Sequence, residues 1–178
     1  MIAKLLLEAT LDTLYMTFVS TFLAFIIGLG LAIILVITNK NGLKPNKAIY
    51  NALDIIVNTL RSFPFIILII VLFPFTKFIV GTSIGTTAAI VPLTIGSAPF
   101  IARLIENAMN EVDHGIIEAA LSYGATKTQI IFKVIFIEAL PSIINAITLT
   151  LIVVIGFTAM AGAVGGGITV LVHVLLKE

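Results

Sequence analysis

The chain has 178 residues, of which 60% are hydrophobic and 11% are charged, and its mean hydropathy is +1.21. Soluble domains carry about 25% charged residues, so this composition excludes an ordinary soluble domain and indicates several membrane spans. The net charge of +1 offers no basic surface for nucleic acid, and the lack of cysteine excludes disulfides and zinc–thiolate sites. The phosphate-binding pattern G-x-x-x-x-G-K-[ST] does not occur, so any ATP hydrolysis would belong to another chain.

The first predicted membrane helix is the uncharged segment 13–37, which is longer than the ~20 residues needed to cross a bilayer. Small residues recur at every fourth position within it, at Ser20, Ala24, Gly28 and Ala32. This spacing places them on one helix face and favours close packing against another helix. Chance is the alternative interpretation, because glycine and alanine are common in membrane helices.

Three further segments are long and apolar enough to cross a membrane, and we predict spans at residues 55–76, 78–102 and 142–161. The third span should begin with a turn at residues 81–87 and contain two proline kinks. The glycine-rich segment 162–167 should end the fourth span. We expect no acidic residue inside a span, which argues against an intramembrane enzyme.

Arg61 is the one formal charge inside a predicted span, and Pro64 follows it by three residues. A charge at membrane depth suggests a role in function, so both residues are candidates for a pathway or gating role. The alternative is that Arg61 lies near the cytoplasmic interface and anchors the helix there.

The distribution of lysine and arginine predicts the orientation. The first loop carries Lys40, Lys44 and Lys47, and segment 103–138 carries three more basic residues, whereas the second loop carries Lys77 alone. The positive-inside rule therefore places the first loop and segment 103–138 in the cytoplasm.

Segment 103–138 holds eight of the 19 charged side chains of the protein. Apolar residues at helical spacing predict two short amphipathic helices in it. Gly124 lies between them and suits a helix end with positive φ, while Thr126 and Gln129 match a capping box. Glu118 projects from the first helix. Periodicity alone leaves two interpretations, a solvated interfacial loop or a docking element for a partner.

Six residues in and after this segment form a recognisable pattern: Glu118, Ala119, Ala120, Gly124, Leu140 and Pro141. The pattern resembles the EAA loop of binding-protein-dependent ABC importer permeases, in which the loop docks onto a cytoplasmic ATPase. The stretches G-T-S-I-G, A-A-I-V-P-L-T and P-F-I-A-R narrow the resemblance to methionine-uptake permeases. One departure is that Phe136 and Ile137 stand where many such permeases carry Leu-Pro.

The resemblance implies an all-α polytopic fold, the type I transmembrane domain of ABC importers. A single domain would cover residues 11–178, with four spans and a cytoplasmic helix–Gly–helix coupling element at residues 103–138. The family's last helix would be lacking, because members continue past the glycine-rich turn into a further long helix.

The implied function is that of a permease subunit of an ATP-driven importer of methionine, in the D or L form or both. An importer of another small amino acid or osmolyte and a truncated, non-transporting membrane subunit are the alternatives. The implied partners are cytoplasmic ABC ATPase subunits, a second permease copy and an extracytoplasmic substrate-binding lipoprotein, in a bacterial inner membrane. The resemblance implies no catalytic residue, cofactor or metal.

Overall fold

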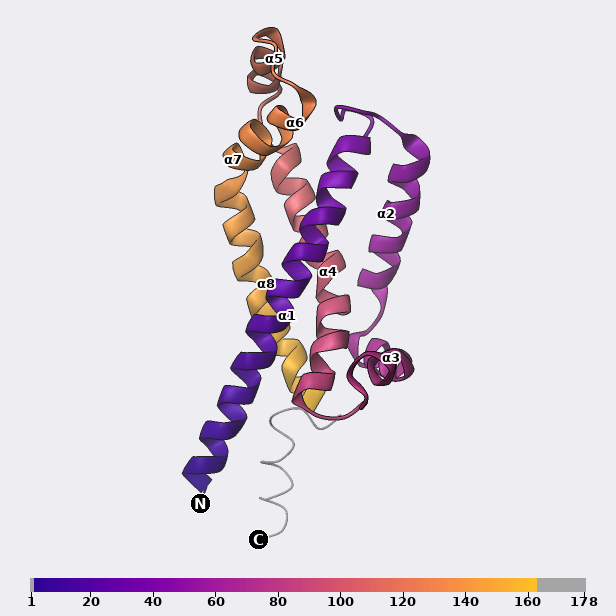
Figure 1. Cartoon of the computed structure of the whole chain (residues 1–178), viewed down its shortest axis with the longest axis vertical. Helices are drawn as coiled ribbons and strands as arrows, with labels where there is room; N and C mark the ends of the chain where they lie inside the picture. Colours follow the sequence, from indigo (N-terminus) through magenta and orange to yellow (C-terminus); the bar gives the residue numbers. More distant parts are fainter. Residues whose placement is uncertain (1, 163–178) are drawn as a thin grey trace.

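A computed structural model describes residues 2–162, and all of its regular elements are helices (Figure 1). In chain order they are α1 (Ile2–Thr38), α2 (Lys47–Ser62), α3 (Phe65–Val80), α4 (Thr86–Asn110), α5 (His114–Ser122), α6 (Lys127–Gln129), the π-helix η1 (Ile130–Ile135), α7 (Phe136–Glu138) and α8 (Leu140–Ala161). Three of them, α1, α4 and α8, are long and apolar enough to cross a membrane alone, and α2 and α3 qualify as a pair. The prediction of an all-α polytopic protein is confirmed. The predicted glycine-rich turn lies, beyond Gly162, outside the described residues.

The predicted single helix across residues 55–76 is wrong, because α2 and α3 are separate helices bent by 110° relative to each other. Phe63 has an extended backbone with ψ of 132°, as a residue before proline prefers. Pro64 then caps α3 without continuing α2, since proline has no N–H for a helical hydrogen bond. In Figure 1, α3 lies across the end of α2 that is distant from α5.

The small-residue face of α1 packs against α4, with which α1 makes its most extensive contact. Ser20, Ala24 and Ala32 are completely buried. A Cβ atom added to Gly28 would lie only 2.3 Å from the Ile101 Cγ2 atom and 3.0 Å from the Ala98 carbonyl oxygen. The packing interpretation of this face is therefore confirmed.

We expect Gly28→Leu to destabilise the protein by about 1–3 kcal/mol or more, because the added side chain would force α1 away from α4. Gly30 provides a matched control in the same helix, since a Cβ added there meets no atom within 4 Å. The thermal unfolding midpoint of the purified protein in detergent should fall for Gly28→Leu and stay close to wild type for Gly30→Leu. Equal effects of the two changes would contradict the assignment of this packing face.

The loop between α1 and α2 lies at the same end of the molecule as α5, α6 and α7, whereas α3 lies at the opposite end (Figure 1). The Lys127 Nζ atom donates a 2.8 Å hydrogen bond to the carbonyl oxygen of Leu43, which joins the two basic segments directly. The lysine-bearing segments predicted to be cytoplasmic thus share one end, and Lys77 in α3 belongs to the other end.

Because the chain contains no cysteine, single-cysteine labelling can test this orientation directly. Lys44, Lys77 and Lys133 are all exposed. In intact cells, a membrane-impermeant maleimide should modify Lys77→Cys alone, and Lys44→Cys and Lys133→Cys should react only after the membrane is opened. Reaction of Lys77→Cys and Lys133→Cys from the same side would refute the predicted topology.

Candidate coupling element and membrane pathway

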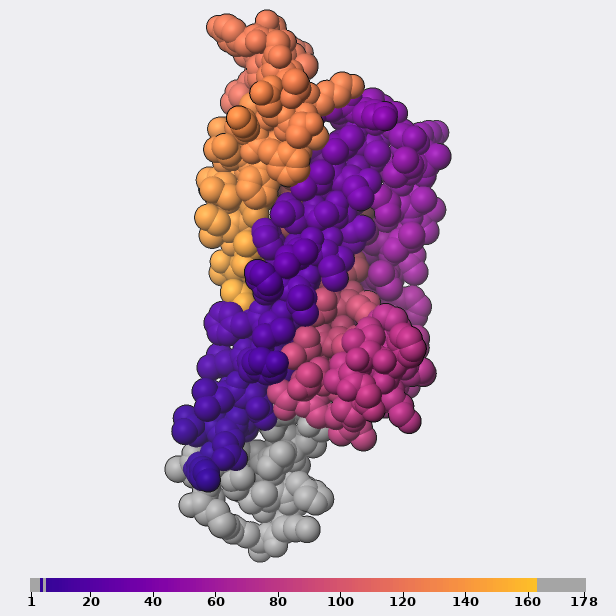
Figure 2. Space-filling view, in the orientation of Figure 1, coloured from indigo at the N-terminus to yellow at the C-terminus, as the bar shows by residue number. Residues whose placement is uncertain are grey.

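The helix α5 is the most isolated element of the molecule. It projects beyond the long helices at the end that carries the α1–α2 loop (Figures 1 and 2), and none of its residues is buried. The Asp113 side chain caps its start by accepting a 2.6 Å hydrogen bond from the Gly115 N–H. Glu118 and Ala119 are exposed on it, Ala120 is partly buried, and Tyr123 at its end is 92% exposed. Ile117 and Ala120 pack against the core of the protein, and the rest of this apolar-rich helix is exposed and suited to receive a partner.

Gly124 ends this helix in the left-handed conformation, with φ of +81°. Its N–H donates to the Leu121 carbonyl oxygen at 2.9 Å, and the Ala125 N–H donates to the Ala120 carbonyl oxygen at 3.0 Å. A Cβ atom added to Gly124 would meet nothing within 4 Å. Glycine is therefore favoured here because of its backbone conformation and not because a side chain would clash. The predicted positive φ at Gly124 is confirmed.

The predicted capping box then starts the second helix of the element. The Thr126 hydroxyl oxygen accepts from the Gln129 N–H at 3.3 Å, and the Gln129 side-chain oxygen accepts from the Thr126 N–H at 2.8 Å. Both halves of the reciprocal pair are present, so the sequence prediction is confirmed.

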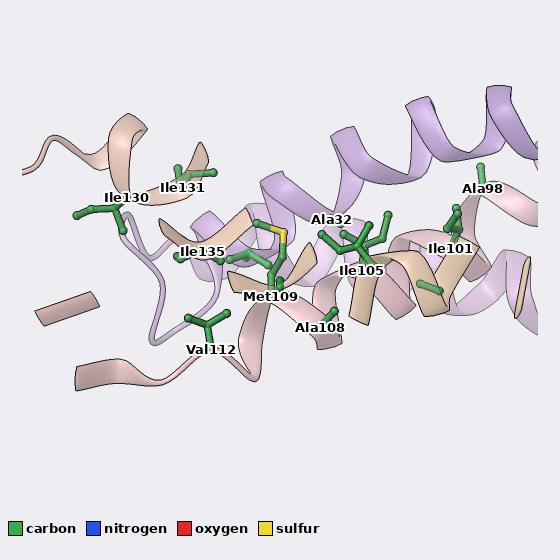
Figure 3. Close-up of a cluster of buried hydrophobic side chains, with 14 of the residues drawn as sticks. Ala32, Ala98, Ile101, Ile105, Ala108, Met109, Val112, Ile130, Ile131 and Ile135 are labelled. Atoms are coloured by element: carbon green, nitrogen blue, oxygen red, sulfur yellow. The ribbon is translucent and has the colours of Figure 1, made fainter. Parts of the chain in front are cut away.

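The second helix, formed by α6, η1 and α7, is packed against the long helices. Ile130, Ile131 and Ile135 are at most 6% exposed and belong to one cluster with Met109 and Val112 at the end of α4 (Figure 3). The second helix therefore anchors the candidate coupling element to the long helices, and α5, the first helix, remains exposed to solvent.

The helix continues through Phe136 and Ile137, where many permeases of the resembled family carry Leu-Pro, and it ends at Glu138. Leu140 and Pro141 begin α8, with the proline in the first turn where its missing N–H has no helical partner to lose. The pattern residues Glu118 to Gly124 therefore lie together at the projecting tip. Leu140 and Pro141 lie apart from them, beyond the second helix.

A partly buried polar cluster that the sequence analysis did not predict joins α2 to α4. The Arg103 guanidinium forms a 2.7 Å ion pair with Glu106, a second ion pair with Asp54, and a 3.1 Å hydrogen bond to the Asn58 side-chain oxygen. The Tyr50 hydroxyl donates a 3.2 Å hydrogen bond to the other carboxylate oxygen of Glu106. Glu106 is only 1% exposed, so its charge depends on these two partners.

The helix α4 continues beyond the predicted span to Asn110 and contains Glu106. Residues 103–110 form the last two turns of α4, before α5 begins. A sequence signal for the cluster exists: polar residues recur along one face of α2 at Lys47, Asn51, Asp54, Asn58 and Arg61. A polar helix face within an apolar protein requires polar partners, and Arg103 and Glu106 are spaced i, i+3 to provide them.

Arg61 lies in the last turn of α2, and Pro64 lies two residues after that helix ends. Lys47 begins α2 at the predicted cytoplasmic end of the molecule, and Arg61 follows it by 14 residues. The predicted pathway residues therefore lie about 21 Å along the helix from that end. This position argues against cytoplasmic anchoring of Arg61. The assignment of Arg61 and Pro64 to the pathway stays a prediction.

Arg61 borders a cavity of about 600 Å³ at the bend between α2 and α3. Its Cζ atom lies 6.0 Å from the centre of the Phe100 ring. On another wall, the rings of Phe65 and Phe157 stack with centres 4.2 Å apart and planes within 7°. The cavity thus combines a cation with aromatic surface. Within residues 2–162, no cluster of His, Asp or Glu is arranged to hold a metal ion.

Comparison with known proteins identifies the family to which this architecture belongs. Residues 24–175 match the family described as the inner membrane component of binding-protein-dependent transport systems. The chain belongs to this family. It is accordingly a multi-pass inner-membrane protein whose helices form the membrane part of a transport system, and the family to which the sequence pattern pointed is confirmed.

Individual relatives are similar over most of the chain. A probable D-methionine transport system permease protein MetI of Vibrio cholerae is 54% identical, over 93% of this chain and 73% of that protein. The D-methionine transport system permease protein MetI of Escherichia coli K12 is 52% identical, over 89% of this chain and 73% of that protein.

Two solved transporter structures are similar to this chain over most of its length. A chain of the MetNI methionine ABC transporter in an inward-facing conformation matches with a TM-score of 0.91 and 51% identity, over 93% of this chain and 77% of that chain. An amino acid ABC transporter crystallised with histidines matches with a TM-score of 0.73 at 23% identity, which shows a shared fold.

Proposed function

We propose that this chain is the permease subunit of an ATP-driven methionine importer. The observation that supports this most strongly is an identity above 50%, over about nine tenths of the chain, to permeases of D-methionine transport systems. Residues 11–178 would act as one transmembrane domain that forms half of the translocation path, with a second copy forming the other half. ATP hydrolysis takes place on a separate subunit.

We propose that α5 and its C-terminal turn dock onto that ATPase. Three observations support this: α5 lies at the predicted cytoplasmic end, it has no buried residue, and Gly124 fixes its direction relative to the packed second helix. Glu118 would place a charge in the contact, and the exposed ring of Tyr123 would supply apolar area.

In this mechanism, closure of the ATPase dimer on ATP displaces α5. The second helix carries the displacement into α4 through the cluster around Met109, and into α8 through the start of that helix at Leu140 and Pro141. The ATPase shifts the equilibrium between inward- and outward-facing states only by contacting them differently. A substrate-binding lipoprotein would deliver methionine at the end of the molecule that carries α3.

The function is tested by uptake of radiolabelled D- and L-methionine into proteoliposomes that contain the permease and its partner ATPase and are supplied with the substrate-binding lipoprotein. ATP-dependent accumulation that unlabelled methionine competes away is the expected result. ATP-dependent uptake of another amino acid or an osmolyte without competition by methionine would refute the proposed substrate. Assembly with the ATPase without any uptake would favour a non-transporting subunit.

A further inference from the structure

The cavity at the α2–α3 bend contains a cation that has no anionic partner within the described chain. No carboxylate of residues 2–162 forms an ion pair with Arg61, whereas Arg103 on the neighbouring helix has two such partners. Asn58 lies beside Arg61 on the same wall and uses its side-chain oxygen to accept from Arg103, which leaves its amide N–H groups for another acceptor. These donors at membrane depth suit a carboxylate that arrives from outside the chain.

The opposite side of the cavity is apolar and aromatic. Phe65 and Phe157 are stacked on each other, and Phe100 faces the Arg61 guanidinium. The thioether of a methionine side chain makes favourable contacts with aromatic rings such as these. Gly96 also lines the cavity, and a Cβ added to it would come within 3.1 Å of the Phe65 ring and the Leu68 side chain. Glycine at this position therefore lets α3 pack closely against α4 beside the cavity.

We propose that this cavity is a transit site for the amino acid within the permease, with the substrate carboxylate bound by Arg61 and Asn58 and its apolar side chain against the three phenylalanine rings. This inference rests on the proposed function and adds the site and the groups that recognise the substrate. The volume of about 600 Å³ lies within the ~300–1,000 Å³ typical of small-molecule sites.

The location of the cavity also fits a transit site. Phe100 lies 14 residues after the start of α4 at Thr86 and ten residues before its end at Asn110, or about 21 and 15 Å along the helix, so the cavity lies toward the middle of α4. Interrupted membrane helices are tolerated where they border a water-filled or ligand-filled space, and transporters place substrate sites at such interruptions. The bend between Ser62 and Phe65 is an interruption of this kind.

The photolabelling test uses the assembled permease–ATPase complex in detergent without the binding lipoprotein, so that the selectivity of that protein cannot contribute. Uptake by the same variants is measured separately, in proteoliposomes supplied with the lipoprotein. The probe is a methionine analogue in which a photoreactive diazirine replaces the thioether. Labelled peptides should map to residues 58–65, 96–100 or 153–157. Methionine should suppress the labelling far better than methioninamide, which lacks the carboxylate.

Arg61→Gln should reduce labelling and raise the KM for methionine uptake by at least about tenfold, with the discrimination against methioninamide lost. Arg61→Lys should restore part of both. Gly96→Leu should also reduce labelling, because its side chain would displace Phe65 and Leu68 at the wall of the cavity. Lys77→Gln, which removes a charge outside the cavity, is the control and should leave the KM unchanged. The unfolding midpoint of each variant separates loss of binding from loss of fold.

Two failures can be told apart. If the wild-type complex transports methionine while Arg61→Gln keeps its KM and the label maps elsewhere, the transit site is refuted and the proposed function stands. If Arg61 is found crosslinked to a second copy of the chain, the residue is a subunit contact and the transit site is likewise refuted. If the wild-type complex transports no methionine, the proposed function itself fails.

Discussion

Gly124→Val is expected to reduce methionine uptake by about tenfold or more, while the protein still inserts into the membrane. Gly124 has φ of +81°, where a β-branched residue is rarely found and costs roughly 1–3 kcal/mol. Relief of that cost would redirect α5 and lower the fraction of permease that can dock. ATP hydrolysis and radiolabelled uptake, measured in the same proteoliposomes, should show the loss of coupling.

Two further variants test separately the orientation of α5 and the charge of Glu118. Gly124→Asn should retain much of the uptake, because asparagine tolerates the left-handed conformation better than other residues. Glu118→Lys should also uncouple uptake, because Glu118 is exposed and its charge would lie in the proposed contact with the ATPase. Gly156→Val in α8 is the control for a new β-branched residue, because a Cβ there meets no atom within 4 Å. Full coupled uptake by Gly124→Val would show that the bend does not set docking.

Arg103→Gln is expected to destabilise the protein by about 3–5 kcal/mol, because it leaves the buried carboxylate of Glu106 without its ionic partner. Asp54→Asn should cost much less, since the Asp54 side chain is 33% exposed and Arg103 would keep its bond to Glu106. Chemical unfolding of the purified protein, followed by the accessibility of a cysteine placed on α2, measures both effects.

The double variant Arg103→Gln with Glu106→Gln tests whether the cost of Arg103→Gln comes from the unpaired charge of Glu106. It removes the buried charge together with its partner, so it should be more stable than Arg103→Gln alone. Its stability relative to the two single variants gives the coupling energy between the residues. A double variant as unstable as the sum of both single variants would show that Arg103 and Glu106, which both belong to α4, do not stabilise each other.

Features that depend on local sequence or on a single helix were predictable. The capping box of Thr126 and Gln129, the positive φ of Gly124 and the packing face of α1 each follow from residues a few positions apart. The spans α1, α4 and α8 follow from long apolar segments.

Features that depend on how α2 lies against other helices were not predictable from hydropathy. The apolar composition continues across Pro64. One kinked helix and two helices bent by 110° therefore give almost the same hydropathy profile. The cluster of Arg103 with Asp54 and Glu106 joins residues about 50 positions apart. Only the polar face of α2 indicated that such partners were needed.

The π-helical turn at Ile130–Ile135 is a place where one residue could be deleted without rotating the side chains that follow it. The Phe136 N–H bonds to the Ile131 carbonyl oxygen five positions back, so this turn holds one residue more than an α-helical turn. Deleting a residue from an ordinary α-helix rotates everything after it by about 100°. A deletion here would instead return the turn to four-residue bonding, and the buried face of α8 would keep its alignment with α4.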